Sequence, residues 1–390
     1  MTDKLLRAPC ERMILRGVLG LKLEKQALFD KIEVNNIRGD IMVTIKDIAK
    51  ECNVSIATVS NVINGKKKAG PETQDKIFEA VNRLGYKTNK VAKGLRSRKT
   101  GTIGIIVEDL SQFTVPNIVE GITRHLETVG YKPVLVNLRL YSRWADKWFN
   151  NEDMISETME QTLDELTSIM VDGIIYIAVH ARDTEKIPAD LNIPAVMVYA
   201  LEQNPNVPSV VIDDEQSAYE EVCYLIEKGH KDIGIIGGRE DNMHTRLRLK
   251  GALRALSEHG IEQRADRVCY ALWGKKEGYE AAQMLADKGV TAFFVMADRM
   301  AGGVYEYAKD HGIAIGKDWS VVGFDDQILA DYLMPGLTTM ALPLHPLGDA
   351  AAKLLVSKME SSECDISLTD NICRIPCIFR ERGSVADLTK

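Results

Sequence analysis

The chain has 390 residues, of which 45% are apolar and 27% charged, a composition typical of a soluble protein with two or three folded domains. Its seven cysteines are scattered and form no C-x-x-C pair, which argues against a disulfide framework or a zinc site and fits a reducing compartment. No run of about 20 apolar residues predicts a membrane span. The cysteines are Cys10, Cys52, Cys223, Cys269, Cys364, Cys373 and Cys377.

The net charge of −7 is unevenly distributed along the chain. Residues 43–100 carry 13 Lys and Arg against five acids, a charge of +8, and residues 1–42 add +2, whereas residues 101–390 sum to −17. A compact basic module on an acidic body is typical of polyanion binding, because each cation placed at a phosphate releases counterions. A merely solvated charged face would not concentrate the charge in this way.

Residues 1–42 match no pattern in the rest of the chain. The segment 13–23 faintly suggests the apolar core of a signal peptide, but Arg16 and Lys22 interrupt it and no small-residue cleavage site follows. A start at Met42 would leave the next module complete. We therefore expect residues 1–42 to be an extension, either a disordered arm or the product of an upstream start site.

Two short helices joined by a sharp turn are predicted for residues 44–64. Asn53 stands at the turn, where it tolerates the left-handed conformation, and Ser55 is a good N-cap for the second helix. In a helix-turn-helix the second helix enters the major groove of DNA. The inward apolar positions are Ile45, Ile48, Ala49, Val59, Val62 and Ile63. The outward positions, able to reach base edges or phosphates, are Ile56, Ala57, Ser60 and Asn61.

A third helix is predicted between the start signal Gly70–Pro71 and Gly85–Tyr86. The basic hinge that follows, residues 89–100, is a weak autonomous helix because Gly94 interrupts it, which is typical of a segment that folds only on DNA. Within it, Leu95 is a candidate wedge between base steps of a kinked minor groove, with ordinary linker packing as the alternative. The buried stripe expected for the third helix is Ile77, Ala80, Val81 and Leu84.

Beyond residue 100 the pattern changes to apolar strands that alternate with amphipathic helices. Strands that are apolar throughout lie in parallel sheets covered on both faces. Two such units in series predict two doubly wound lobes, with a ligand in the crevice at the carboxyl ends of the strands. The expected strands are 102–108, 132–137, 173–179, 194–199, 209–213, 232–238, 292–297 and 319–325. The expected helices are 115–129, 155–168, 217–228, 245–259, 277–288 and 301–311.

The predicted strand ends carry an aromatic plate, arginines and carboxylates, which together suit a polyhydroxylated ring. No nucleophile motif, zinc-binding motif or P-loop accompanies them, and Gly237–Gly238 indicates a strand-end turn rather than a phosphate cradle. We therefore expect no catalytic site, no metal and no cofactor. The residues at or near these ends are Glu108, Asp109, Tyr199, Arg246, Arg248, Trp273, Asp298, Arg299, Asp325 and Asp326.

The motifs T-I-K-D-I-A, T-V-S-N-V-I-N-G and G-Y-K-T-N-K-V-A-K-G-L-R closely resemble the lactose/galactose-repressor family of bacterial transcriptional regulators, over about residues 43–383. The resemblance implies an all-α helix-turn-helix headpiece followed by an α/β, two-lobed, periplasmic-binding-protein-like effector domain. It implies a sequence-specific DNA-binding regulator rather than an enzyme, most often a repressor. It also implies a cytoplasmic, nucleoid-associated homodimer that binds a pseudo-palindromic operator and a small-molecule effector such as a sugar.

By position, the resemblance assigns base reading to Ile56, Ala57 and Asn61. Many family members have Arg where Asn61 stands and Pro where Thr88 stands, so the operator sequence does not carry over. Phosphate-contacting and structural roles fall on Thr44, Ser55, Thr58, Ser60 and Asn64. Hinge contacts fall on Asn89, Ala92 and Leu95.

Effector contacts are assigned in the same way to Arg248, Trp273, Asp298 and Asp325, and the strand-end pattern adds Glu108 and Tyr199. The alternative for each is a structural ion pair, a core aromatic or a helix cap. The chain departs from the family at Ala297, where Asn is common, in 108–113, which lacks an Asn-Pro pair, and in 138–153, which is longer and more aromatic than a usual connection. The effector therefore does not carry over.

The predicted organisation is an extension, a headpiece, a hinge, an effector and dimerisation domain, and a tail. There are two rival classes. One is a transporter's solute-binding protein, which the basic module argues against, and the other is an enzyme, for which the sequence shows no catalytic constellation. No leucine heptad follows Gly383, so a tetramer is not indicated. The ranges are 1–42, 43–88, 89–100, 101–383 and 384–390, with lobe one at about 101–200 and 344–366 and lobe two at about 201–340 and 370–383.

Overall fold

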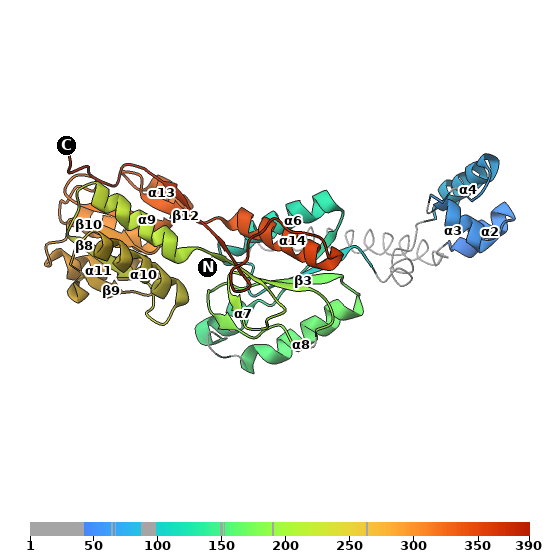
Figure 1. Cartoon of the computed structure of the whole chain (residues 1–390), viewed down its shortest axis with the longest axis horizontal. Helices are drawn as coiled ribbons and strands as arrows, with labels where there is room; N and C mark the ends of the chain where they lie inside the picture. Colours follow the sequence, from blue (N-terminus) through green and yellow to red (C-terminus); the bar gives the residue numbers. More distant parts are fainter. Residues whose placement is uncertain are drawn as a thin grey trace, which may run out of the picture. The chain divides into compact units, whose positions relative to one another are not determined.

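A computed structural model divides the described chain into two compact units, one before residue 90 and one after it (Figure 1). The expected extension and most of the hinge lie outside the described residues. The described residues are 43–63, 65–66, 68–86, 99–148, 151, 153–188, 191–262 and 264–390.

In the first unit, α2 (Ile45–Cys52), α3 (Ile56–Ile63) and α4 (Pro71–Leu84) pack around one small core. Gly85, with φ +64°, ends α4 as a left-handed C-cap. The expected inward faces are confirmed. The buried members are Ile48, Ala49, Cys52, Val59, Val62, Ile77 and Ala80, and the partly buried ones include Ile45, Ile63, Val81 and Leu84.

The first lobe of the second unit is a parallel sheet in the order β13–β7–β5–β3–β1–β2. Its central strands are rich in Val and Ile and buried, as expected for a sheet covered on both faces. Helices α6 and α14 pack side by side, and α8 lies on the other side of the sheet (Figure 1). The strands are β1 (Thr102–Val107), β2 (Lys132–Asn137), β3 (Gly173–Ile177), β5 (Ala195–Val198), β7 (Ser209–Ile212) and β13 (Ile372–Ile375), and the helices are α6 (Val115–Val129), α7 (Leu140–Trp144), η1 (Ala145–Trp148), α8 (Asp153–Ser168) and α14 (Leu344–Glu360).

The second lobe has the strand order β14–β12–β11–β10–β8–β9, parallel except for β14, which pairs antiparallel with β12. Its strands and helices again bury continuous apolar runs. The strands are β8 (Ile233–Gly237), β9 (Val268–Tyr270), β10 (Ala292–Val295), β11 (Ser320–Asp325), β12 (Thr338–Ala341) and β14 (Ile378–Arg380), and the helices are α9 (Asp214–Glu227), α10 (Met243–Glu258), η2 (Ala265–Arg267), α11 (Lys275–Ala286), α12 (Asp298–Asp310) and α13 (Ile328–Tyr332).

Within the described residues the chain crosses between the lobes at three places: after β7, after β12 and after β13. The expected boundary near residue 200 is therefore wrong. Strand β7 pairs with β5 and β13 in the first sheet, so residues 201–212 and 372–375 belong to the first lobe. A further short pair, β4 (Asp183–Thr184) with β6 (Leu201–Glu202), lies beside that sheet.

Candidate functional site

Side-chain caps build the turn between α2 and α3. Asn53 takes the left-handed conformation, with φ +53° and ψ +46°, as predicted. The Ser55 hydroxyl accepts a hydrogen bond from the Thr58 N–H at 3.0 Å, which caps α3. At the start of α2, the Thr44 hydroxyl and N–H both donate to Asp47, at 2.7 and 2.8 Å, and these bonds lower the pKa of that carboxyl.

We expect Ser55→Ala to lower the local stability of α3 by about 1 kcal/mol, because the N–H of residue 58 loses its acceptor. Amide hydrogen exchange in α3 should then be roughly fivefold faster, measured by mass spectrometry on the full chain. Ser55→Asp keeps a capping oxygen and serves as the matched control. Equal exchange in wild type and Ser55→Ala would show that the cap contributes nothing.

The start of α3 presents an exposed face that the core does not need. Ile56 is 43% exposed and Ala57 is exposed too, whereas Thr58, Ser60 and Asn61 are half-buried. An exposed apolar and polar helix face suits contact with base edges and the sugar–phosphate backbone. Four of the predicted contact residues lie outside the described residues: Asn64, Asn89, Ala92 and Leu95.

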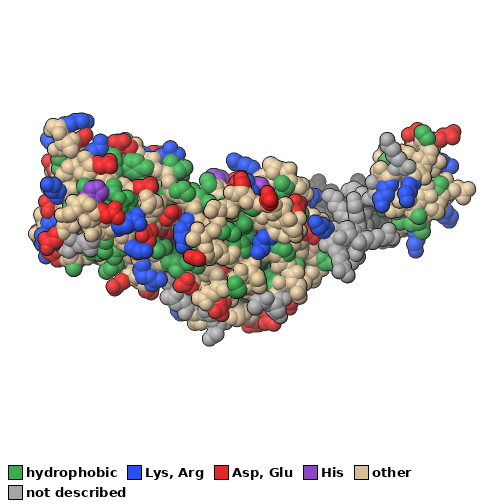
Figure 2. Space-filling model, in the orientation of Figure 1, with side chains coloured by type: hydrophobic (Ala, Val, Ile, Leu, Met, Phe, Trp, Pro, Cys, Tyr) green, Lys and Arg blue, Asp and Glu red, His purple; other side chains and the backbone are tan. Residues whose placement is uncertain are grey.

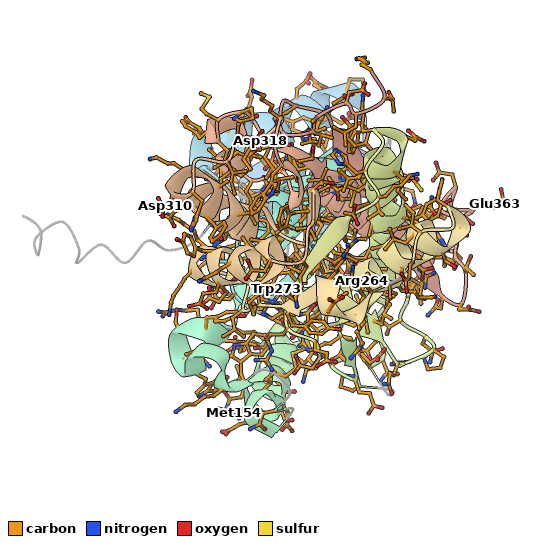
Figure 3. All side chains as sticks on the ribbon, turned by 90° about the vertical axis from the view of Figure 1, so that its left-hand side faces the viewer. Met154, Arg264, Trp273, Asp310, Asp318 and Glu363 are labelled. Atoms are coloured by element: carbon orange, nitrogen blue, oxygen red, sulfur yellow. The ribbon has the colours of Figure 1, made fainter. Side chains whose placement is uncertain are left out.

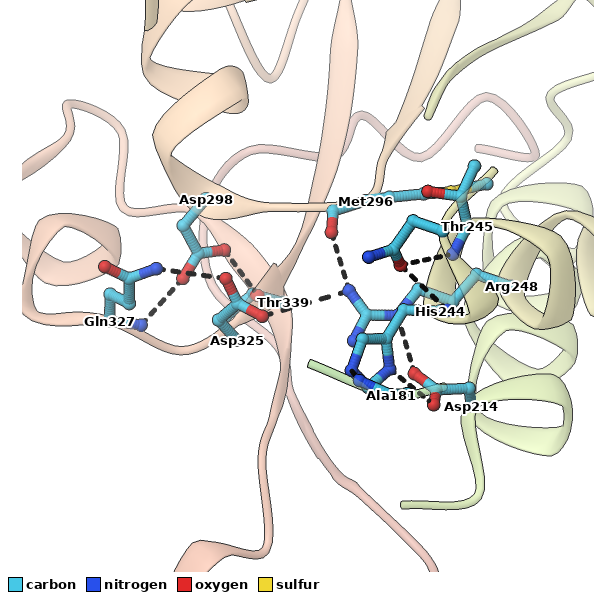
Figure 4. A network of polar contacts seen from close by, with 11 residues as sticks. Ala181, Asp214, His244, Thr245, Arg248, Met296, Asp298, Asp325, Gln327 and Thr339 are labelled. Carbon is cyan, nitrogen blue, oxygen red and sulfur yellow. Dashed lines mark hydrogen bonds and ion pairs between the residues drawn. The ribbon is translucent and has the colours of Figure 1, made fainter. Parts of the chain in front are cut away.

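In the second lobe, Arg248 of α10 is 2% exposed and lies at the centre of a polar network (Figure 4). Its Nε donates to Asp214 Oδ1 at 2.8 Å and its Nη1 donates to the Met296 carbonyl at 2.7 Å. Asp325 Oδ1 is 3.9 Å from Nη1, and the guanidinium lies 3.7 Å from the centre of the Phe324 ring. Burial opposes its charge, but Asp214 and Asp325 more than compensate and raise the pKa of Arg248.

His244, one turn before Arg248, connects this network to the first lobe. Its Nδ1 lies 2.8 Å from Asp214 Oδ2, and the Ala181 N–H donates to its Nε2 at 3.3 Å. Because Nε2 accepts, the ring proton of the neutral form sits on Nδ1 and is donated to Asp214. The Tyr199 ring packs against His244 with centroids 5.0 Å apart. These contacts bring both lobes to one point of the cleft.

Asp298 and Asp325 follow β10 and end β11, and both carboxyls are buried. Asp298 accepts hydrogen bonds from the Thr339 hydroxyl and the Gln327 N–H, each at 2.7 Å. Asp325 Oδ2 accepts from Gln327 Nε2 at 3.0 Å. Burial raises the pKa of Asp298 to about 8, with help from Asp325. Burial also raises the pKa of Asp325 to about 6, despite Arg248. Burial of the two neighbouring carboxyls therefore favours the protonated form of Asp298.

Glu221 of α9 is a buried acid that the sequence reasoning missed. It is 0% exposed, and neither carboxyl oxygen has a hydrogen-bond partner among the described residues. Burial, together with Asp298 and Asp325, raises its pKa well above the ordinary value, although Arg248 opposes this. The available signal was its place on the inward face of the helix, four residues after the buried Ser217.

Trp273 follows β9 and is half-buried, with its indole resting on Gly238. A Cβ at residue 238 would lie 1.9 Å from Trp273 Cζ2, so no larger residue fits there. In Figure 3, which faces the second lobe, the label of Trp273 is near the middle of the view and that of Asp310 is at the left. Like Tyr199 and Asp325, Trp273 has a positive φ, +64° against +72° and +112°. Such strained backbone is often found at functional sites.

Glu108, at the end of β1, already has internal partners for both carboxyl oxygens. It forms a buried ion pair with Arg182 and accepts from the Tyr176 hydroxyl and the Val179 N–H, each at 2.8 Å. Burial would raise its pKa, but the Arg182 charge and these bonds hold it below the ordinary value. A ligand would have to displace Arg182, a partner that the sequence reasoning did not find. Asp109 is also engaged, by the Ser111 hydroxyl at 2.7 Å.

A pocket of about 590 Å³ lies where the chain crosses between the lobes after β7, and it is lined by residues of both lobes. Tyr199 belongs to the first lobe, and Asp214 and His244 to the second. Arg246, predicted to lie near the site, also lines it and is exposed. The pocket thus adjoins the network of Arg248 and gives a ligand access to groups from both lobes.

The fold and these two sites define a class: a small helix-turn-helix unit joined to a two-lobed ligand-binding body. Residues 44–89 match the family described as bacterial regulatory proteins, lacI family, and residues 222–385 match a periplasmic binding protein-like domain. Catabolite control protein A of Priestia megaterium is 34% identical over 334 residues, 84% of this chain and 95% of that protein. The chain belongs to the lacI family, and it is a sequence-specific DNA-binding transcriptional regulator.

Two solved structures share the fold. The lac repressor dimer bound to operator and the anti-inducer ONPF has a TM-score of 0.71 and 24% identity, covering 88% of this chain and 99% of that one. A complex of the transcriptional regulator CelR with cellobiose has a TM-score of 0.59 and 25% identity, with the same coverage. In the part of the chain that the structure describes, no helix is long and apolar enough to cross a membrane.

Proposed function

We propose that the protein is a homodimeric repressor whose affinity for a pseudo-palindromic operator is set by a carbohydrate or related metabolite bound between its lobes. The observation that carries this proposal is the network around Arg248, which joins strand-end carboxylates to a hydrogen bond between the lobes. The relatives are named as a control protein and a regulator, which supports a protein that acts by binding rather than by catalysis. As a regulator that binds bacterial DNA, it would act in the cytoplasm.

On the DNA side, Ile56, Ala57 and Asn61 read base edges in the major groove. The exposure of Ile56 and Ala57 at the start of α3 supports this assignment, and Asn61, half-buried, lies one turn further along the same helix. Leu95 of the hinge widens the minor groove at the centre of the operator, so Leu95→Ala should reduce DNA bending. Phosphate contacts fall on Thr44, Ser55, Thr58, Ser60 and Asn64, and further hinge contacts fall on Asn89 and Ala92.

We expect Asn61→Ala to relax the base preference at one position of each half-site, with a loss of about tenfold or more in discrimination there. An amide that bonds a base edge bidentately gives this selective effect, whereas a phosphate contact would weaken all sequences equally. Competitive binding to operators with single base changes measures it. Asn82→Ala, an exposed change on α4, is the matched control. A uniform loss across all operators would contradict the base-reading role.

An exposed apolar segment on the second lobe supports the homodimer. Three apolar side chains within seven residues are highly exposed, Ile328 at 80%, Tyr332 at 77% and Met334 at 84%, and apolar surface of this kind suits a protein interface. We expect Tyr332→Asp to shift the protein from dimer to monomer in analytical ultracentrifugation and to weaken operator binding, because each operator has two half-sites. Phe78→Asp, on exposed α4 surface, should leave the dimer intact. If the Tyr332→Asp variant were still a dimer, this segment would not be part of the dimer interface.

In the cleft, the effector is held by four side chains: Arg248, Trp273, Asp325 and Tyr199. Asp298 and Glu108 have supporting roles at the base of the same site. A ligand that draws the lobes together changes the angle between them and hence the spacing of the two hinges, which either releases or tightens the operator complex. The experiment titrates mono- and disaccharides against a protein–operator complex, with Asp325→Asn in parallel. At least one sugar should change operator affinity fivefold or more in wild type only. An unchanged response in Asp325→Asn would refute the site.

A further inference from the structure

We propose that Asp172 is a positioning residue, which fastens the end of the hinge to the first lobe and so makes operator binding depend on the spacing of the two half-sites. Asp172 directly precedes β3, and the residues that it holds, Thr100 and Gly101, directly precede β1. The inference rests on the proposed dimer with two half-sites. It adds a residue of the two-lobed body to those that determine which operator is bound.

The Asp172 carboxylate accepts two backbone hydrogen bonds from the chain that enters the first lobe. The Thr100 N–H donates to Oδ1 at 2.8 Å, and the Gly101 N–H donates to Oδ2 at 2.7 Å. Gly101 has a φ of +69°, where a residue with a side chain is strained, and such a left-handed residue lets successive N–H groups converge on one anion. Hydrogen bonds to a carboxylate are roughly twice as strong as those between neutral groups. One side chain therefore fixes two successive peptide units.

Further hydrogen bonds from both neighbours of β1 complete this attachment, which we call the hinge clamp. The Thr100 hydroxyl donates to the Met170 carbonyl at 2.8 Å. The Asp172 N–H donates to the Thr102 carbonyl at 2.8 Å, and the N–H of residue 132, the first of β2, donates to the Gly101 carbonyl at 2.8 Å. Residues 100–102 are thus held from the β2 side and from the β3 side.

The Asp172 side chain is not needed to close the turn in which it lies. Two backbone hydrogen bonds, at 2.9 and 3.2 Å, already connect the N–H groups of Met170 and Val171 to the end of α8. Both carboxyl oxygens of Asp172 instead bond a segment 71 or 72 residues earlier in the chain. The carboxylate therefore serves the attachment of the hinge rather than its own turn.

The hinge clamp is built on the centre of the first lobe. Strands β1 and β3 pair in parallel from Ile103 to Val107, and their side chains are buried. Beyond the other end of β3, the Ala181 N–H donates to His244 of the second lobe. Because a packed sheet moves as a unit, a displacement at that contact is passed along β3 to Asp172 and on to residues 100 and 101. The first lobe therefore sets the direction in which the hinge leaves it.

The surface of the lobes is poorly suited to binding DNA directly. On the face that Figure 2 shows, acidic and basic side chains are interspersed over both lobes. Residues 101–390 also carry a net charge of −17. Phosphates are attracted by clustered Lys and Arg, so this surface does not favour them. The lobes therefore influence operator binding through the hinge, which makes its attachment decisive.

The test measures the affinity of the full chain for two operators, by fluorescence anisotropy at one salt concentration. The first is the operator that the chain selects from a random DNA pool. The second carries one extra base pair between the half-sites, which separates them by about 3.4 Å and turns them by about 35°. Wild type should bind the second operator about tenfold more weakly or worse. In Asp172→Ala this ratio should fall below about threefold, because a released hinge follows the displaced half-site.

Two further variants show whether the ratio reports positioning. Asp172→Asn keeps one oxygen for the Thr100 N–H, but its amide nitrogen cannot accept from Gly101, so its ratio should be intermediate. Asp318→Ala is the matched control, because it removes a similar bond, from the Ala314 N–H at 2.8 Å, at an exposed turn of the second lobe. It should keep the wild-type ratio. A variant that is only less stable loses affinity for both operators equally, so the ratio separates positioning from folding.

The proposal is overturned if Asp172→Ala keeps the wild-type ratio, or if wild type binds both operators equally well. Analytical ultracentrifugation distinguishes two causes of the second result. A dimeric wild type without spacing dependence contradicts the hinge clamp alone, whereas a monomeric wild type contradicts the proposed function as well. Thermal unfolding checks each variant, and if Asp172→Ala does not fold, the ratio of Asp172→Asn decides the matter.

Discussion

Replacing Arg248 with alanine is expected to abolish the effector response and to lower the melting temperature of the two-lobed body by on the order of 10 °C. The guanidinium compensates Asp214, which is 3% exposed and accepts from Arg248 Nε at 2.8 Å. Without it the buried Asp214 carboxylate keeps only the His244 ring as a side-chain partner, and the cleft loses the cation nearest Asp325. Scanning calorimetry and operator titration with the active sugar measure the two effects.

Arg264→Ala is the matched control for this change. Arg264 pairs with Asp266 at 2.9 Å on the surface of the second lobe, and exposed pairs of this kind contribute little to stability. The control should melt within about 2 °C of wild type and keep the effector response. If Arg248→Ala also melted near the wild-type temperature and kept the effector response, two assignments would be contradicted: the stabilisation of Asp214 by Arg248 and the role of Arg248 in effector binding.

The second large effect concerns pH. We expect the body to become more stable as the pH falls from about 8 to about 6.5, because burial raises the folded-state pKa of Asp298 to about 8 while its unfolded-state pKa stays near 4. The folded protein then binds a proton that the unfolded chain does not, so stability is lost as the pH rises toward 8. Glu221 acts in the same direction. Below about 6.5, His180 opposes the trend, because burial lowers its pKa to about 4.

Glu221→Leu tests the buried carboxyl directly. We expect it to raise the melting temperature at pH 8 by several degrees, because an unpartnered buried polar group is removed, and to reduce the slope of stability against pH. Glu220→Gln changes the exposed neighbour on the same helix and should alter neither quantity. A lower melting temperature for Glu221→Leu at pH 8 would mean that the carboxylate has a stabilising partner.

Local signals predicted the helix-turn-helix and most strands. Asn53 and Ser55 make their turn and cap contacts with residues only a few positions away, so their roles can be predicted from the local sequence. The apolar runs at 102–107 and 292–295 are buried in parallel sheets, as their continuous apolar character indicates. The lobe boundary could not be predicted in this way. Strand β7 has the same Val- and Ile-rich composition whichever sheet receives it, so its place depends on pairing with β13, more than 150 residues later.

For the candidate site, too, the sequence predicted some of the residues but not the contacts they make with distant segments. Arg248 and Asp325 were expected at the cleft, and the structure brings them to 3.9 Å. The partners of the predicted residues come from distant segments of the chain, so the sequence alone did not predict them. These contacts are the ion pair of Arg182 with Glu108, the ion pair of Asp214 with Arg248, and the hydrogen bond from the N–H of residue 181 to His244. These internal partners decide which predicted residues remain available to a ligand.

The most direct test of the proposed function is the selection of bound duplexes from a random DNA pool by the full chain, at a stated physiological salt concentration, with and without sugars. We predict enrichment of one pseudo-palindrome with two related half-sites, and a change in its recovery when the active sugar is present. A pool that shows no enriched palindrome, with or without sugars, would contradict the assignment of this protein as an effector-controlled operator-binding regulator.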